Sequence, residues 1–186
     1  MRKLVLPLLG LALILGSLGW MLGLRLQTKE DLQQCQTVAG EMAALLPERT
    51  AGITGSDRGM PVLEITETDY AALLELPGFG LALPVEDRWN GGQGVPARFS
   101  GSAYGNDLVI GGLNEAGIFG FCSQVDLGDR IVVTDMTGGE FYYTVVRVDR
   151  AKEAGKDWLD GWDLTLFCHD GYALNYIAVR CALDYQ

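Results

Sequence analysis

Short apolar runs separated by turn-forming residues dominate the chain from residue 60 onwards. Residues 70–85 contain two such runs around a Pro-Gly pair, and another run lies within residues 107–114. Apolar runs of this length, bounded by Gly and Pro, are typical of β-strands. The 25 glycines are scattered between the runs, where they suit turns. The pattern predicts a mainly β domain over residues 60–186.

The most reactive stretch lies at the end of this domain. Residues 164–168 are apolar and Thr-rich, a glycine-containing loop follows, and residues 176–183 alternate apolar positions with an arginine. Two strands joined by such a loop predict a β-hairpin. The hairpin carries Cys168, His169 and Arg180, and His169 is the only histidine of the protein.

The N-terminus has a different pattern. A basic tip is followed by an uncharged run over residues 4–24, which Arg25 closes. A hydrocarbon core of ~30 Å takes about 20 residues to cross, so residues 1–27 are expected to be a cytoplasmic tip and a transmembrane signal-anchor. A cleaved signal peptide is the alternative. The run is long for a signal peptide and offers a poor cleavage site, which favours the anchor.

Residues 28–59 are expected to be a helix and a linker. Thr28 can cap the helix, with Asp31 three residues later, and Pro47 follows the last periodic position. The segment is a helix packed on the domain, a stalk leading from the membrane, or both at once. The apolar residues at helical spacing are Leu32, Cys35, Val38, Met42 and Leu45.

Charge and composition exclude several functions. The formal net charge is −10 without a basic cluster, so the protein should repel nucleic acid. One histidine and four scattered cysteines without a C-x-x-C pair give no zinc spacing. The glycines do not form a phosphate-binding loop. We therefore expect no metal and no cofactor.

The hairpin resembles the end of a sortase, a class B-like member of the membrane-anchored cysteine transpeptidases of Gram-positive cell surfaces. That family ends a strand with Thr-Leu-x-Thr-Cys, where Cys is the nucleophile, and carries its catalytic Arg on the next strand. Residues 165–169 match the first motif, with the preceding Thr on Cys168 and the nucleophile on His169. Arg180, within Val-Arg-Cys, matches the catalytic Arg position.

The resemblance extends over residues 60–183. Residues 70–85 resemble the opening hairpin of sortases, and residues 128–145 resemble a Gly-Asp strand followed by an aromatic strand. The family's catalytic His follows a Gly, and here Leu113 occupies that position between Gly112 and Asn114. The resemblance implies a closed, eight-stranded sortase-like β-barrel in which both the catalytic His and the catalytic Cys are replaced.

The cysteines add a second expectation. Successive side chains of a strand point to opposite faces, so Cys168 and His169 should point apart. If His169 lies opposite Arg180, then Cys168 lies opposite Cys181, within disulfide range. We expect Cys168 and Cys181 to be either bridged or two buried thiols on the non-catalytic face. The other two cysteines are interpreted as ordinary apolar residues.

Three functions remain open. A degenerate sortase, or pseudo-sortase, would be anchored in the cell membrane and bind a sorting-signal-like peptide, a surface protein or an active sortase outside the cytoplasm. An active cysteine transpeptidase would attach surface proteins to the cell wall or a pilus with a shifted Cys168, His169 and Arg180 site. In the third, the barrel is only a scaffold. The first predicts a buried Cys168, and the second predicts Cys168 and Arg180 in one pocket. The third predicts no groove leading to Arg180.

Overall fold

The structure is a computed structural model that describes residues 16–17, 32–56, 58–91, 94–114, 118–170 and 175–184. No helix within these ranges is long and apolar enough to cross a membrane. Apart from residues 16–17, the expected anchor over residues 4–24 lies outside the described residues, as does the start of the expected helix at residue 28.

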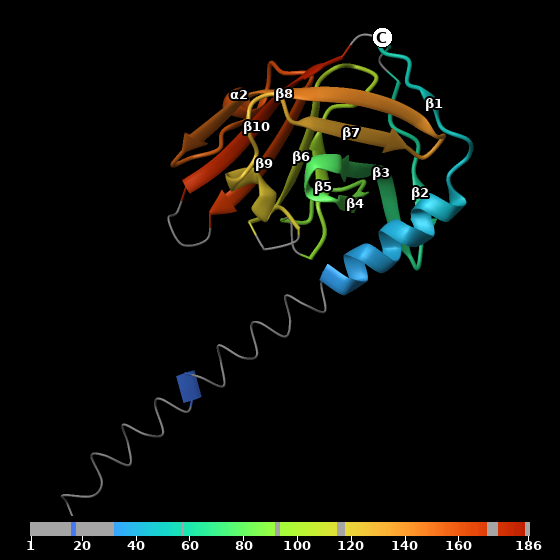
Figure 1. The fold of residues 1–186 in the computed structure, drawn as a ribbon, viewed down its shortest axis with the longest axis horizontal. Helices are drawn as coiled ribbons and strands as arrows, with labels where there is room; N and C mark the ends of the chain where they lie inside the picture. The colour runs from blue at the N-terminus through green and yellow to red at the C-terminus, as the bar shows by residue number, and fades with distance from the viewer. Residues whose placement is uncertain are drawn as a thin grey trace, which may run out of the picture.

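Beyond residue 31, the described chain contains ten strands, one helix of medium length and three short helical turns (Figure 1). One helix spans residues 32–45, and the rest of the elements follow it. The strands are β1 (Thr50–Ala51), β2 (Leu63–Ile65), β3 (Thr68–Leu76), β4 (Leu81–Glu86), β5 (Ala97–Ser100), β6 (Leu108–Leu113), β7 (Arg130–Asp135), β8 (Gly139–Ala151), β9 (Leu164–Asp170) and β10 (Asn175–Leu183). The short helical turns are η1 (Pro77–Phe79), η2 (Gly120–Ser123) and α2 (Lys156–Leu159).

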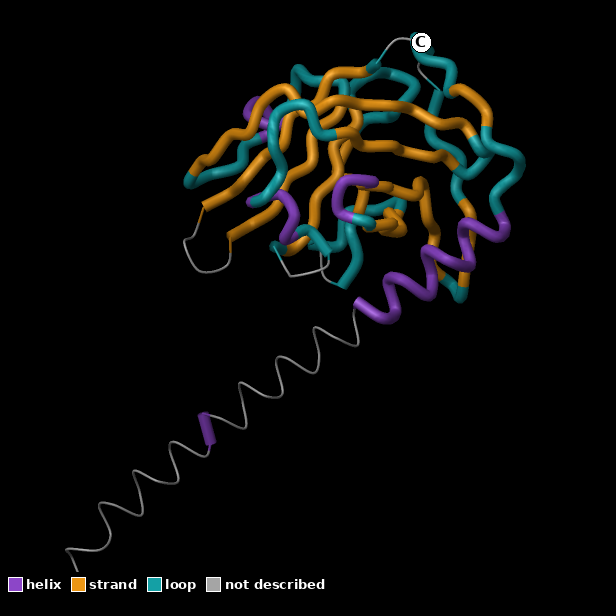
Figure 2. The backbone as a smooth tube through the Cα atoms, viewed as in Figure 1, coloured by secondary structure: helices purple, strands orange, loops and turns teal. Residues whose placement is uncertain are grey.

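Eight of the described strands close into a barrel. The order of pairing is β3-β4-β5-β6-β9-β10-β8-β7, and β7 pairs again with β3. The strands therefore wrap around a common interior (Figure 2). β1 and β2 are short additions that pair with β8 and β3 outside this ring. The expected eight-stranded, sortase-like barrel is confirmed, and closure removes most of the exposed strand edges.

The first hairpin of the barrel forms where the sequence predicts it. β3 and β4 are joined by η1, which begins at Pro77 and ends at Gly80. Proline suits the first position of a helical turn because it lacks an N–H, and an N–H at that position would have no partner within the turn. Gly80 has a φ of 61°, in the left-handed region that favours glycine, and this allows the chain to reverse into β4.

β6 and β9 form a parallel pair, whereas most other strands of the barrel pair in antiparallel fashion. Leu108 pairs with Leu164, and the pairing continues as far as Leu113 with His169. Parallel neighbours need a long crossover, and here the chain between them builds η2, β7, β8 and α2. The carboxyl ends of β6 and β9 consequently meet at one end of the barrel.

The helix over residues 32–45 lies along the outside of β3, at the lower right of the barrel in Figure 1. Ala39 and Met42 are buried against Tyr70 and Leu73 of β3. The expected helix is therefore one that packs on the domain over its described part. Its last apolar position departs from the pattern, because Leu45 is 62% exposed.

Candidate functional site

The two faces of β9 separate its reactive residues. Cys168 belongs to the barrel interior and is fully buried. Phe167 and His169 face outwards, where Phe167 packs in a separate cluster with Leu159 and Ala178. This alternation follows from the period of two in a β-strand. Cys168 is buried, as the pseudo-sortase hypothesis expects, and it shares no pocket with His169.

The outward residues of β6, β9 and β10 form a grid, because each directly opposed pair shares a face. The pairings of β9 with its two neighbours define three rows across the strands. The first row is Val109, Thr165 and Arg180; the second is Gly111, Phe167 and Ala178; the third is Leu113, His169 and Tyr176.

The expected pairing of His169 with Arg180 is wrong. Arg180 lies opposite Thr165, and the residue opposite His169 is Tyr176. β9 and β10 pair as far as Asp170 with Asn175. The expected register would have required a different, longer connection between the two strands. The resulting shift of four residues separates Arg180 from His169 by roughly 13 Å along the strands.

The expected proximity of Cys168 and Cys181 is wrong for the same reason. Cys168 lies opposite Ile177, and Cys181 lies opposite Leu164. Four residues of strand separate the two levels by roughly 13 Å, whereas a disulfide needs Cα atoms within about 7 Å. The four cysteines, all within the described ranges, form no disulfide. Both residues are buried on the interior face, so two buried thiols describe them correctly.

Arg180 is buried rather than exposed in a groove, with a relative exposure of 1%. Its Nη1 donates to the carbonyl of Leu159 at 3.2 Å and to Oγ1 of Thr165 at 3.1 Å. Its Nη2 donates to the carbonyl of Trp158, and its Nε lies 3.3 Å from Oδ2 of Asp149. The guanidinium thus secures the end of α2 against β9 and is not available to a ligand.

The Trp158 ring covers the guanidinium of Arg180, with 4.7 Å between the Arg180 Cζ and the ring centroid. This distance is suitable for a cation–π interaction. Burial lowers the pKa of Arg180, and the hydrogen bond to Asp149 opposes that shift. Because every partner of Arg180 belongs to the chain itself, the first row of the grid is closed by the segment that contains α2.

The third row opens into a pocket of about 270 Å³. Leu113 and His169, two of the expected site residues, both line it. The ring of Tyr176 packs edge-on against His169, with 4.9 Å between the ring centroids. The complete lining is Trp89, Gly91, Gly112, Leu113, Phe167, His169 and Tyr176. The fold therefore brings two of the expected site residues together and leaves Arg180 and Cys168 outside.

Two rings of the pocket wall, Trp89 and Phe167, pack with a third ring, Phe99, beside the pocket. Trp89 lies 5.3 Å from Phe167 and 5.6 Å from Phe99 between ring centroids, and Phe99 lies 5.4 Å from Phe167. Gly111 makes this packing possible, since a Cβ there would lie 2.5 Å from both Phe167 and Trp89. Trp89 and Phe99 stay 38% and 37% exposed, so the wall is accessible from solvent.

Trp89 and Tyr176 were not expected in the site. Trp89 stands at the start of a glycine-rich stretch, and its ring partner in the site, Phe167, is distant in sequence. Tyr176 lies in the site because the register of β9 with β10 places it opposite His169, and the motif alone did not specify that register. No carboxylate lines the described part of the pocket, so its walls suit an apolar or aromatic group.

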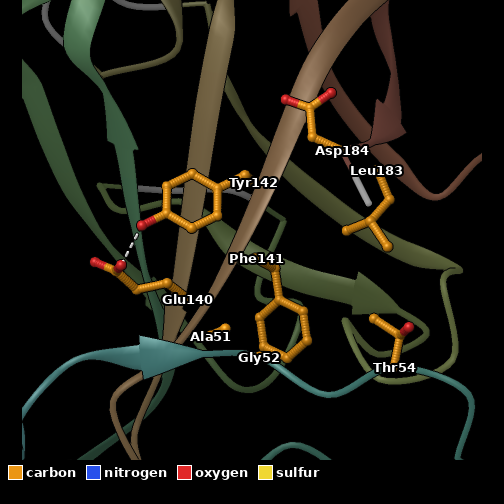
Figure 3. Close-up of a pocket in the computed structure, with 8 residues that line it drawn as sticks. All are labelled: Ala51, Gly52, Thr54, Glu140, Phe141, Tyr142, Leu183 and Asp184. Atoms are coloured by element: carbon orange, nitrogen blue, oxygen red, sulfur yellow. Dashed lines mark hydrogen bonds between the residues drawn. The ribbon is translucent and has the colours of Figure 1, made fainter. Parts of the chain in front are cut away.

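A second hollow, of about 170 Å³, lies where β1 and the end of β10 both approach β8 (Figure 3). Three of its polar side chains already have partners within the chain. The Tyr142 hydroxyl donates to Glu140, which also accepts from Arg49, and Asp184 accepts from Oγ1 of Thr144. Both carboxylates that line the hollow are therefore engaged by groups of the protein itself.

Metal-ligating residues do not gather in threes anywhere in the described ranges. His169, the one strong nitrogen ligand, has Tyr176 and Leu113 as its neighbours in the pocket. A zinc site needs several His, Cys or carboxylate ligands around one point. The third row lacks them and so gives no basis for metal chemistry.

A closed eight-stranded barrel, with a pocket where the parallel strands β6 and β9 end, defines the class of fold. No protein-family model matches the sequence, and a search of curated proteins finds no match. Solved sortase structures do match. The Group B Streptococcus Pilus Island 1 sortase C2 has a TM-score of 0.56 at 14% identity, over 84% of this chain and 98% of that one.

Two further sortases show the same likeness. Sortase C-1 from Actinomyces oris has a TM-score of 0.54 at 15% identity, over 86% of this chain and 99% of that one. Sortase A from Corynebacterium diphtheriae has a TM-score of 0.52 at 15% identity, over 86% of this chain and 85% of that one. The protein is therefore similar to sortases in its fold.

Proposed function

We propose that this protein is a pseudo-sortase, anchored in the cell membrane by residues 4–24, which binds a peptide or partner outside the cytoplasm without catalysing transfer. One observation carries the proposal. Leu113 and His169, which the resemblance aligns with the family's catalytic His and Cys, both line a hollow that opens on the third row. The pocket is thus kept where sortases have chemistry, while the reacting groups are replaced.

The side chains of the third row support binding rather than acyl transfer. Cysteine catalysis needs a thiolate exposed to substrate, next to a base and an oxyanion donor. Cys168 lies inside the barrel, and Leu113 can neither accept a proton nor stabilise a thiolate. Arg180 donates all of its described hydrogen bonds within the chain, which argues against the alternative Cys168, His169 and Arg180 site.

The lining of the pocket suggests the kind of ligand. Its rings and Leu113 favour a bulky apolar side chain, and its backbone glycines, Gly91 and Gly112, allow an extended chain to approach closely. Sortases act on surface proteins through sorting-signal peptides, so a peptide of that kind is the proposed ligand. The net charge of −10 favours a neutral or basic partner over an acidic one.

The test uses the full chain in detergent with peptides based on sortase sorting signals. Binding is followed by intrinsic tryptophan fluorescence, and intact mass spectrometry searches for a thioester adduct. We expect saturable binding that changes the Trp89 emission, no adduct, and loss of the fluorescence change in Trp89→Phe. An active sortase, acylated in parallel, shows that the peptides are competent.

Other results would redirect the assignment. An adduct on Cys168 that disappears in Cys168→Ala would establish a relocated nucleophile and an active transpeptidase. Absence of binding to every peptide would favour the scaffold hypothesis, which also agrees with the burial of Arg180 outside the pocket lining. Tyr176→Ala should weaken peptide binding, whereas Arg147→Ala, on an exposed part of β8, should not.

A further inference from the structure

The second half of β8 has a neighbouring strand on one side only. β10 pairs with β8 as far as Ala151, whereas β7 covers the other side of β8 only as far as Thr144. The backbone of Val145 bonds the loop that precedes β7, and past it no strand pairing or backbone hydrogen bond of the described residues reaches this side. Residues 146–151, which continue past β7 towards the left of Figure 1, are called the free edge of β8.

An unpaired strand edge exposes backbone N–H and C=O groups that can pair with another chain. In an antiparallel ladder, alternate residues direct both groups towards one neighbour, so roughly half of the free edge has its groups on the unpaired side. β10 already holds this backbone extended, so pairing with a second strand would cost little further conformational entropy. Many natural edges carry charges that oppose pairing, and the charges of the free edge therefore decide what it accepts.

The charges on one face of the free edge alternate in sign. Arg147 and Asp149 are two residues apart and share the outer face with Arg180, which lies opposite Arg147 on β10. Both arginines donate to Asp149, since the Nε of Arg147 lies 2.6 Å from Oδ1 and the Nε of Arg180 lies 3.3 Å from Oδ2. Two cations thus share one carboxylate. Arg180 is buried and also bonds a carbonyl, whereas the Arg147 side chain is 61% exposed and accessible to a further carboxylate.

We propose that two copies of the chain associate through their free edges, in antiparallel register about a two-fold axis at Val148. Each Arg147 then lies opposite Asp149 of the other copy, so the interface contains two cross-strand pairs of opposite charge, which stabilise a sheet. A parallel arrangement would place Arg147 opposite itself, and like charges in direct opposition are destabilising. A surface that is complementary to itself about a two-fold axis is what a symmetric dimer requires.

Exposed apolar side chains at the start of the free edge would add to this interface. Val146 is 41% exposed and Leu127 is 69% exposed. Their segments are adjacent, because the N–H of Gly128 donates to the Val145 carbonyl at 2.8 Å. In the proposed register, Val146 lies opposite Arg150 of the other copy, whose aliphatic stem can cover it. None of these residues lines the pocket, so the proposal goes beyond binding at the third row and does not depend on it.

The test uses the full chain in detergent at a series of protein concentrations. Sedimentation velocity should show an equilibrium between one and two copies. Hydrogen exchange followed by mass spectrometry should become slower in residues 146–151 as the copies associate. Arg147→Glu places like charges at both cross-strand pairs, so the dissociation constant should rise by about tenfold or more. Arg88→Glu changes the net charge equally at an exposed position after β4 and should leave association unchanged.

The controls keep the proposal open to contradiction. Because the Arg147 side chain is exposed in the single chain, Arg147→Glu should keep its fold, which circular dichroism checks, and should still bind peptide at the third row. A single copy at every concentration, equal association in Arg147→Glu and the unaltered protein, or fast exchange of the free edge in the associated state would each overturn the proposal. Slower exchange of the free edge with a sorting-signal peptide, without association of two copies, would also overturn it and make the edge a peptide-binding strand.

Discussion

The first and third rows of the same three strands have opposite properties. The first row contains the only buried arginine in the described chain, and α2 covers it with a ring and two backbone carbonyls. The third row contains the only histidine and opens into a pocket walled by Trp89 and Phe167. A buried cation that bonds groups of its own chain has a structural role, whereas a wall that contains the part-exposed Trp89 is available to a ligand.

The largest effect is expected from Arg180→Ala. Its loss leaves the Trp158 and Leu159 carbonyls without their donor and removes one partner of the part-buried Asp149, and loss of such a buried cation costs roughly 3 kcal/mol. Urea unfolding measures this loss of stability. Arg147→Ala is the matched control, since Arg147 also bonds Asp149 but its side chain is 61% exposed, and it should cost under about 1 kcal/mol. Equal losses would contradict the structural role of Arg180.

Trp158→Ala should have a smaller effect on the same row. It removes the ring 4.7 Å from the Arg180 Cζ while leaving the backbone carbonyl in place. Cation–π contacts that are shielded from water contribute about 2 kcal/mol. Chemical denaturation should show a loss of that order, and Trp158→Phe should recover part of it. If the two variants unfold alike, the ring does not stabilise the guanidinium.

Gly111→Ala tests the second row, between the two extremes. The new Cβ would lie 2.5 Å from atoms of Phe167 and Trp89, so the rings must shift into the pocket. Overpacking of this kind costs about 1 kcal/mol or more. The free energy of ligand binding, measured by Trp fluorescence, should fall by more than the free energy of unfolding does. Gly78→Ala is the control, because no atom lies within 4 Å of its added Cβ, and it should leave binding unchanged.

The smallest effect is expected from Glu86→Gln at the end of β4, beside the loop that carries Trp89. Burial raises the pKa of Glu86 above its ordinary 4.5, and the hydrogen bond from Asn90 opposes this. The folded state therefore binds the proton more tightly than the unfolded chain, and this stabilisation is lost as pH rises through the raised pKa. The midpoint of thermal unfolding of Glu86→Gln should be slightly higher than that of the unaltered protein at pH 7. The difference between the two midpoints should vanish below pH 4.5. A difference that grows towards low pH would contradict this sign.

Local pattern predicted most of the fold. The apolar runs around Pro77, the run ending at Leu113 and the two arms of the last hairpin all form strands, because their side-chain period and turn residues are local properties. Alternation also placed Cys168 and His169 on opposite faces correctly. The motif order gave Leu113 and His169 as members of one site, and the parallel pairing of β6 and β9 places them side by side.

Register could not be predicted in the same way. The expected pairs, His169 with Arg180 and Cys168 with Cys181, differ from the observed ones by four residues, an even shift that keeps every side chain on its face. Alternation alone cannot detect such a shift, because the same residues stay buried.

The sequence by itself determined which residues form strands and which face each side chain takes, because both depend on neighbours along the chain. Only the tertiary structure decided the register between β9 and β10. It also decided that α2 covers Arg180 and that Trp89 lies against Phe167. Those outcomes depend on contacts between segments distant in sequence. Their free energies come from burial and hydrogen bonding in the closed barrel, which no local pattern encodes.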